Sequence, residues 1–165
     1  MSETSNLVLH VAAIGVGATL LTDLWSLARR RLWGIALPDY GLVGRWVSHM
    51  RHGQFRQDAI ARAAPQRAER AIGWIVHYLT GVAFAAALPA IGGAGWLRHP
   101  ALGPALIVGI GSVAAPFLLM QPAMGAGIAA SRTPDPRAAR RRSLAMHAVF
   151  GLALYAAGWA SRAFG

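Results

Sequence analysis

The chain of 165 residues contains no cysteine and no lysine, and only 6 of its residues are acidic. Without cysteine it can form no disulfide, no thiolate metal site and no cysteine nucleophile. Charged residues make up 13% of the sequence and hydrophobic residues 55%, and the mean hydropathy is +0.42. This composition leaves too little polar surface to cover a soluble fold, so it indicates a membrane protein.

Motifs of common enzymes and of nucleic-acid-binding proteins are also missing. The sequence has no P-loop, no H-E-x-x-H zinc motif and no Ser/His/Asp arrangement. A net charge of +10 would suggest nucleic-acid binding in a soluble protein. However, the sequence shows no helix-turn-helix, no zinc-finger spacing and no basic strand with interleaved aromatic residues. We therefore expect no nucleic-acid partner, predict no cofactor and favour a non-enzymatic role.

Four long apolar stretches account for most of the chain, and they cover residues 7–28, 71–92, 101–121 and 144–160. At about 1.5 Å of rise per residue, each is long enough to cross a hydrocarbon core about 30 Å thick. The first stretch is followed by three arginines rather than by a small-residue cleavage site, so we expect a retained anchor and not a signal peptide. The sequence predicts an all-α, integral membrane four-helix bundle forming a single domain, residues 1–165. Four helices rich in small residues enclose only a thin interior, so a homo-oligomer stays an open alternative.

The placement of arginine predicts the orientation. Nine of the 16 arginines lie between residues 29 and 70, five lie between residues 132 and 142, and the others are Arg98 and Arg162. Basic residues in short loops stay on the cytoplasmic side, so we expect both termini to be periplasmic, in a bacterial inner membrane. Tryptophans near both ends of the spans, including Trp96 and Trp159 at the outer ends, are typical of interfacial belts. Each arginine would also be attracted to anionic lipid headgroups, by about 1 kcal/mol.

The first arginine-rich loop contains a short amphipathic pattern at residues 42–50. Val43, Trp46, Val47 and Met50 recur at helical spacing, whereas Arg45, Ser48 and His49 fall elsewhere around the helix. This pattern predicts a short helix lying on the inner membrane surface, started by a turn at residues 38–41.

Ionisable residues inside apolar spans are costly and therefore mark candidate functional positions. The four in this chain are His10, Asp23, His77 and His147. The last three lie about 7 to 11 Å along their helices from the inner arginines, which places them at a similar depth. Gln121, at the inner end of the third stretch, would complete a polar layer. His10 lies near the outer end of the first span, and we assign it no role.

Small residues at four-residue spacing accompany all three positions, in Gly73-xxx-His77-xxx-Gly81, His147-xxx-Gly151 and Gly15-xxx-Thr19-xxx-Asp23. Such spacing marks helix faces that approach one another, so we expect these side chains to converge. The leading hypothesis is a binding or transport component that handles protons, a cation or a small solute. Two alternatives stay open: a metal-dependent enzyme with Asp23, His77 and His147 as zinc or iron ligands, or an accessory subunit with a structural polar layer.

Several motifs along nearly the whole chain resemble those of a known family. They are Gly17-Ala-Thr19 with Asp23-Leu-Trp25, Gly44-Arg-Trp46 with His49, residues 69–74 with His77-Tyr78, Gln121-Pro-Ala-Met-Gly125, and residues 147–151. On these motifs the chain resembles DUF2938, an uncharacterised family of small bacterial inner-membrane proteins. The resemblance implies a multi-span bacterial membrane protein. It carries no assigned activity, so it transfers no catalytic residue.

The arginine asymmetry leads to a test of orientation. A reporter that is active only outside the cytoplasm should work when fused after Gly165 or within residues 93–98, because those segments are predicted to be periplasmic. The same reporter should fail when fused near Gly53 or Pro136. Activity of the fusions near Gly53 or Pro136 would contradict the predicted orientation.

Overall fold

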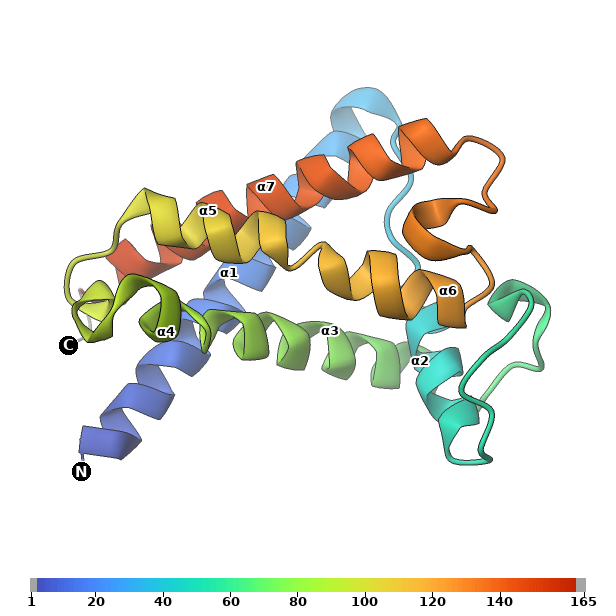
Figure 1. Ribbon diagram of the computed structural model, residues 1–165, viewed down its shortest axis with the longest axis horizontal. Coiled ribbons are helices and arrows are strands. Elements are labelled where there is room, and N and C mark those ends of the chain that lie inside the picture. Colours follow the sequence, from blue (N-terminus) through green and yellow to red (C-terminus); the bar gives the residue numbers. More distant parts are fainter. Residues whose placement is uncertain (1–2, 163–165) are drawn as a thin grey trace. The chain divides into compact units, whose positions relative to one another are not determined.

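The computed structural model describes residues 3–162, and within that range it contains helices and loops but no strand (Figure 1). Four helices are long and apolar enough to cross a membrane: Ser5–Trp33, Glu69–Gly92, Leu102–Ala123 and Pro136–Ser161. They confirm the all-α architecture with four spans, and a short helix in the first loop accompanies them. The chain divides into two compact units, which are described separately below. The first contains the residues up to Leu37, Tyr78–Ser112 and those from Ala145, and the second contains Pro38–His77 and Val113–Leu144.

The first span is a single helix, α1 (Glu3–Trp33), which extends beyond the predicted stretch 7–28 at both ends. Arg30 and Arg31 occupy its last turn, where positive charge interacts favourably with the helix dipole. Gly34 follows with a φ of +65°, and its N–H donates to the carbonyl of Arg30 at 3.0 Å. A left-handed glycine directly after the last helical residue is a common way for a helix to end.

The second span consists of two helices, α3 (Glu69–Ala85) and α4 (Leu88–Gly92). The Glu69 side chain, at the first residue of α3, accepts a hydrogen bond from the Gln66 N–H at 2.9 Å and so holds the turn that leads into the helix. Pro89 lies in the first turn of α4, where its missing N–H costs no helical hydrogen bond.

The third span is interrupted at its centre. It begins as α5 (Leu102–Gly111), continues as the π-helix η3 (Ala115–Met120) and ends as α6 (Gln121–Ala123). Pro116 has no N–H to donate, so the regular hydrogen-bond ladder cannot continue through it, and a wider π-turn follows. This irregularity separates the part of the span in the first unit from the part in the second.

The fourth span, α7 (Pro136–Ser161), begins well before the predicted residue 144. Asp135 caps it by accepting a hydrogen bond from the Ala138 N–H at 2.9 Å, and Pro136 takes the first helical position. Most arginines of the second arginine-rich segment, residues 132–142, therefore lie within α7.

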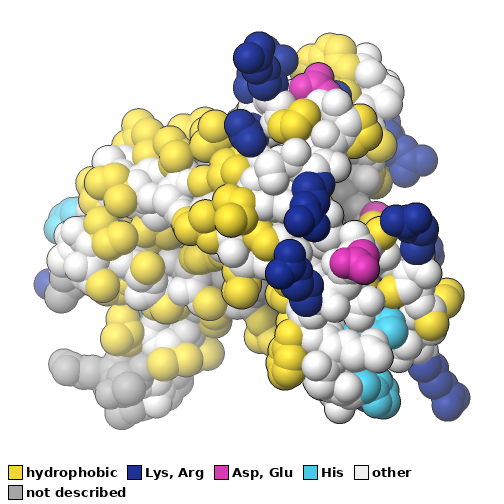
Figure 2. Space-filling view, turned by 45° about the vertical axis from the view of Figure 1, so that its right-hand side comes forward, with side chains coloured by type: hydrophobic (Ala, Val, Ile, Leu, Met, Phe, Trp, Pro, Cys, Tyr) yellow, Lys and Arg dark blue, Asp and Glu magenta, His cyan; other side chains and the backbone are white. Residues whose placement is uncertain are grey.

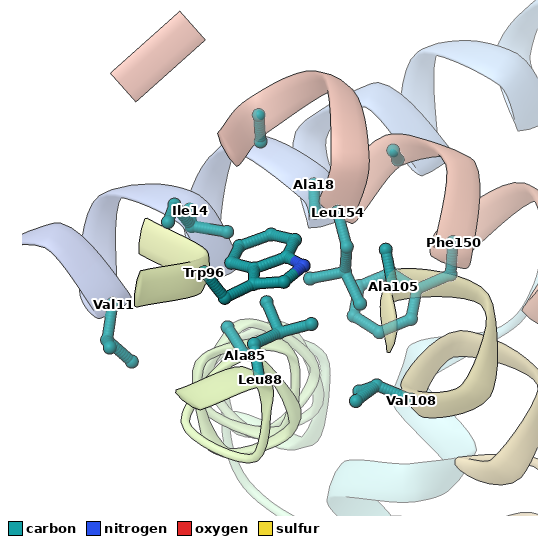
Figure 3. Close-up of a cluster of buried hydrophobic side chains, with 12 residues drawn as sticks. Val11, Ile14, Ala18, Ala85, Leu88, Trp96, Ala105, Val108, Phe150 and Leu154 are labelled. Carbon is teal, nitrogen blue, oxygen red and sulfur yellow. The ribbon is translucent and has the colours of Figure 1, made fainter. Parts of the chain in front are cut away.

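The core of the first unit surrounds Trp96, as Figure 3 shows. Only 2% of this side chain is exposed, and its indole N–H donates to the Ala101 carbonyl at 3.0 Å. Leu88, Leu154 and Ile14 are buried in the same cluster. Trp96 is therefore a core residue, because η2 (Ala94–Leu97) folds its indole onto Gly158, where no side chain obstructs it.

Many large apolar side chains remain outside the core. They include Leu20 and Leu24 of α1, Leu79 of α3 and Leu152 of α7, of which between 49% and 63% is exposed. Figure 2 shows hydrophobic side chains spread over a large part of the visible surface. Such surfaces on membrane helices are in contact with lipid.

Glycines mark the places where the helices of the first unit approach most closely. Gly15 of α1 lies against the backbone at Val82 of α3, and Gly81 of α3 lies against Thr19 of α1. Gly109 of α5 lies against the backbone at Gly151 of α7. Small residues allow backbones to approach in this way, as the four-residue spacing predicted for Gly15, Gly81 and Gly151.

Two glycines of α5 offer a matched test of this packing. Gly109→Ala should destabilise the protein by about 1 to 3 kcal/mol, because the added methyl group would collide with the Gly151 backbone. Gly111→Ala should be neutral or stabilising by up to about 1 kcal/mol, because its methyl group would meet open space and alanine favours helix. Thermal unfolding in detergent, followed by circular dichroism, measures both. Equal effects of the two substitutions would contradict this packing.

Candidate functional site

Asp23 lies on α1 and is bonded to α3. Its Oδ2 accepts a hydrogen bond from the phenol of Tyr78 at 3.2 Å. The neighbouring hydroxyl groups are engaged elsewhere, since Thr19 and Thr22 each donate to a carbonyl one turn earlier in α1, at 2.8 Å. The sequence offered Asp23 no cation three or four residues further along its own helix, and the structure supplies a phenol from the neighbouring helix.

His147 lies on α7 and is bonded to α5. Its Nδ1 is 2.7 Å from the Ser112 hydroxyl, which in turn donates to the Gly109 carbonyl at 2.6 Å. A serine hydroxyl that donates its single proton to Gly109 can only accept from His147, and this arrangement corresponds to the tautomer with the imidazole proton on Nδ1. Ser112 is buried, with 5% of its surface exposed. Sequence analysis did not identify it, although it directly follows the glycines at the end of α5.

His77 lies on α3, in the second unit, and belongs to an aromatic cluster. Its ring stacks on Tyr40 of α2 (Tyr40–Met50) with 4.0 Å between centroids and 22° between planes. The Trp74 ring meets it edge-on at 5.8 Å. The imidazole is thus held between two helices by aromatic contacts.

The three predicted ionisable residues are distributed over both units. Asp23 and His147 belong to the first unit and His77 to the second. Among residues 3–162, no group of three or more His, Asp or Glu side chains could hold a metal ion. The convergence of the three residues into one layer stays a prediction, as does their role as zinc or iron ligands.

Gln121 begins α6, directly after the π-helix. Its main-chain carbonyl accepts a hydrogen bond from the Ala126 N–H at 2.8 Å. Its side-chain Oε1 is buried and has no hydrogen-bond partner within the described part of the chain. A buried acceptor of this kind is costly, which makes Gln121 a polar position of interest in the second unit.

A charged site that sequence analysis missed joins α2 to α3. Arg45 donates from Nε and from a terminal nitrogen to the two carboxylate oxygens of Glu69, both at 2.8 Å. The remaining terminal nitrogen lies 3.2 to 3.4 Å from the main-chain carbonyls of Ile60 and Ala63. Hydrogen bonding to Glu69 raises the pKa of Arg45 above its ordinary value. Only 13% of the Arg45 side chain and 22% of the Glu69 side chain are exposed, so solvent screens the pair only partly.

Two glycines make this ion pair possible. Gly44 of α2 lies directly against the backbone of Glu69, and Gly73 lies directly against the backbone of Tyr40. Any side chain at either glycine would force the helices apart. The two halves of this contact could be seen in the sequence as separate motifs, but nothing in their spacing paired them.

The predicted short helix is present, with Asp39 capping it through a 2.9 Å hydrogen bond from the Gly41 N–H. Its polar side is buried, because 1% of Ser48 and 8% of His49 are exposed. The ring nitrogens of His49 face Gln54 Oε1 at 2.8 Å and the Ala64 carbonyl at 3.1 Å. The loop after α2 therefore folds back over the face that was expected to lie away from the membrane.

The chain belongs to DUF2938, a family of proteins of unknown function, whose family model matches residues 12–161. This confirms the resemblance seen in the sequence. No curated protein and no solved structure matches the chain. Asp23, Arg45, Glu69, His77 and His147 all lie within the matched range.

The Arg45–Glu69 pair can be tested with a double-mutant cycle. Arg45→Gln and Glu69→Gln should each destabilise the protein by about 1 to 2 kcal/mol, because each leaves a partly buried charge without its partner. The double variant should cost less than the sum of the single changes. Arg62→Gln, at an exposed position in η1 (Ile60–Arg62), is the control and should have almost no effect. Strictly additive losses in thermal unfolding would mean that the pair is not coupled.

Proposed function

Because no activity is assigned to the family, we propose a function from the residues: a non-enzymatic component of a bacterial inner membrane that binds or transports protons. Asp23, His77 and His147 are the proposed proton-handling residues, with Gln121 as a further polar position. The same hypothesis includes a cation or a small solute as the species that these residues handle. The observation that supports protons is the 3.2 Å hydrogen bond between Asp23 and Tyr78 within the first two spans. Ionisable groups within spans commonly mark proton or ion pathways.

The chemistry of the Asp23–Tyr78 pair suits a proton relay. An ionised carboxylate accepts the phenol proton, whereas a protonated carboxyl group can itself donate, so the pair remains hydrogen-bonded in both states. In hydrocarbon, this lowers the cost of each state, because no water is available to replace a lost partner.

His147 provides a second group of the same kind. Its Nδ1 proton is directed to Ser112, which is anchored on the Gly109 carbonyl, so Nε2 is the nitrogen that can take up a proton. Imidazole is the side chain best suited to exchange protons near neutral pH. The anchored serine fixes the ring without using the nitrogen that would react.

The proposed orientation places both termini in the periplasm and both arginine-rich loops in the cytoplasm. Arginines in the last turn of α1 and early in α7 are consistent with helix ends that meet anionic headgroups. Only 22 to 28% of the most apolar part of each span is buried within the chain, which leaves room for a homo-oligomer. The metal-dependent enzyme and the structural subunit remain the competing hypotheses. Metal analysis of the purified protein distinguishes the metal-dependent enzyme from the other two.

Proton flux into proteoliposomes tests the proposal. Vesicles that contain a pH-sensitive dye and the full chain should acidify faster than protein-free vesicles when a pH gradient and a compensating potassium diffusion potential are applied. Asp23→Asn should slow this flux by about tenfold or more, because an amide cannot take up the proton. Tyr78→Phe and His147→Gln should slow it less if each is one step of the relay.

Two polar residues outside the spans serve as matched controls. Asp58→Asn and His52→Gln change the same chemical groups in the first arginine-rich loop and should leave the flux unchanged. Wild-type flux no greater than that of protein-free vesicles would refute proton transport. Stoichiometric zinc or iron that is lost in His147→Gln would instead support the metal-dependent enzyme.

A further inference from the structure

A surface pocket of about 440 Å³ lies entirely within the second unit. Its lining consists of two arginines, one serine, one glycine and four apolar residues: Arg56, Arg132, Ser131, Gly127, Leu119, Pro122, Ala123 and Ile128. None of these lining residues is acidic. Positive charge and apolar surface therefore meet in one concave site.

Backbone hydrogen bonds hold the Arg56 side of the pocket in place. The Gln57 N–H donates to the Ala123 carbonyl at 2.7 Å, and the Ile60 N–H donates to the Met124 carbonyl at 3.1 Å. These bonds fasten the loop that carries Arg56 to the end of the third span. Arg56 is thus carried to the pocket by a segment whose backbone is hydrogen-bonded to the end of the third span.

The Arg132 side is formed by a tight loop after α6. Gly127 has a φ of +75°, and a side chain on it would collide with Ser131 and Arg132. The Arg132 N–H closes the loop by donating to the Ala126 carbonyl at 2.9 Å. Arg140 of α7 donates from Nε to the Ala129 carbonyl at 2.8 Å, which adds a third guanidinium beside the same loop.

Two guanidinium groups and a hydroxyl are the donors that bind phosphate best, because guanidinium presents paired N–H groups to phosphate oxygens. The apolar residues that line the pocket would contact a different part of the ligand. Leu119 belongs to the membrane-spanning segment Leu102–Ala123, and 64% of it is exposed, as is 62% of Ile128. These side chains would contact hydrocarbon if a lipid phosphate were bound between the arginines.

We propose that this pocket binds the phosphate group of an anionic phospholipid, with Arg56, Arg132 and Ser131 on the phosphate and Leu119 and Ile128 against the acyl chains. The site lies at the end of a span, where the headgroups of a bilayer are located. A free phosphate ion has the same binding chemistry for the polar half of the pocket but makes no use of the apolar half. The inference does not depend on proton transport, since it concerns other residues.

Binding to the full chain in detergent tests the site, with native mass spectrometry measuring dissociation constants for phosphatidylglycerol, phosphatidylcholine and inorganic phosphate. Phosphatidylglycerol should bind best. Arg56→Gln combined with Arg132→Gln should weaken its binding by roughly a hundredfold, at roughly tenfold for each charged hydrogen-bonding group. The control is Arg62→Gln combined with Arg67→Gln, two exposed arginines of the same unit that do not line the pocket. It should change the constant less than twofold.

Leu119→Ser distinguishes the two sources of phosphate. It should weaken phosphatidylglycerol binding and leave inorganic phosphate unaffected if the ligand is a lipid. If inorganic phosphate binds as tightly as the lipid and Leu119→Ser changes nothing, the ligand is the free ion and the phosphate site itself is upheld. Equal binding of phosphatidylcholine and phosphatidylglycerol, or equal effects of the two arginine pairs, would overturn the proposal. Unchanged thermal unfolding of the variants, which alter only exposed side chains, excludes misfolding as the cause.

Discussion

Close contact between helix backbones at glycine is the constraint on which the polar interactions of this protein depend. In the first unit, the crossing at Gly15 and Gly81 brings α1 near enough to α3 for Asp23 to reach Tyr78. The crossing at Gly109 does the same for Ser112 and His147. In the second unit, the contact of Gly44 with Gly73 aligns Arg45 with Glu69. Bulkier residues would separate these helices by more than a hydrogen bond can bridge.

This arrangement solves a problem that the membrane imposes. A polar side chain in hydrocarbon must find its partner within the protein, since no water replaces a lost hydrogen bond. Within the spans, two such pairs are a carboxylate with a phenol and an imidazole with an anchored hydroxyl. At the start of the second span, a guanidinium from the first loop pairs with a carboxylate. Each pair joins two helices, so the groups that are most costly to bury also fix how those helices pack.

The two functional proposals concern different parts of the chain and different physics. Proton handling is proposed for titratable groups within spans, where the free-energy cost of a charge is high. Phosphate binding is assigned to guanidinium groups beyond the end of the third span, where Pro116 and the π-helix lead into a short α-helix and a tight glycine loop. The first depends on groups that exchange protons, and the second on arginines that keep their charge at any physiological pH. One can therefore fail without the other.

The helical class, the four spans, the short loop helix and the small residues at helix contacts could all be predicted from the sequence, because these features depend on local composition and on spacing along one helix. The sequence also singled out Asp23, His77 and His147 as costly polar positions, whereas their convergence remains a prediction. The hydrogen-bond partners of the polar residues could not be predicted in this way, because Tyr78, Ser112 and Glu69 lie 55, 35 and 24 residues from the groups they bind. The tertiary structure also buries Trp96 and places Arg56 and Arg132 in the lining of one pocket. Such pairings depend on how helices rotate against one another and on the interruption at Pro116, which the periodicity of a single segment does not encode.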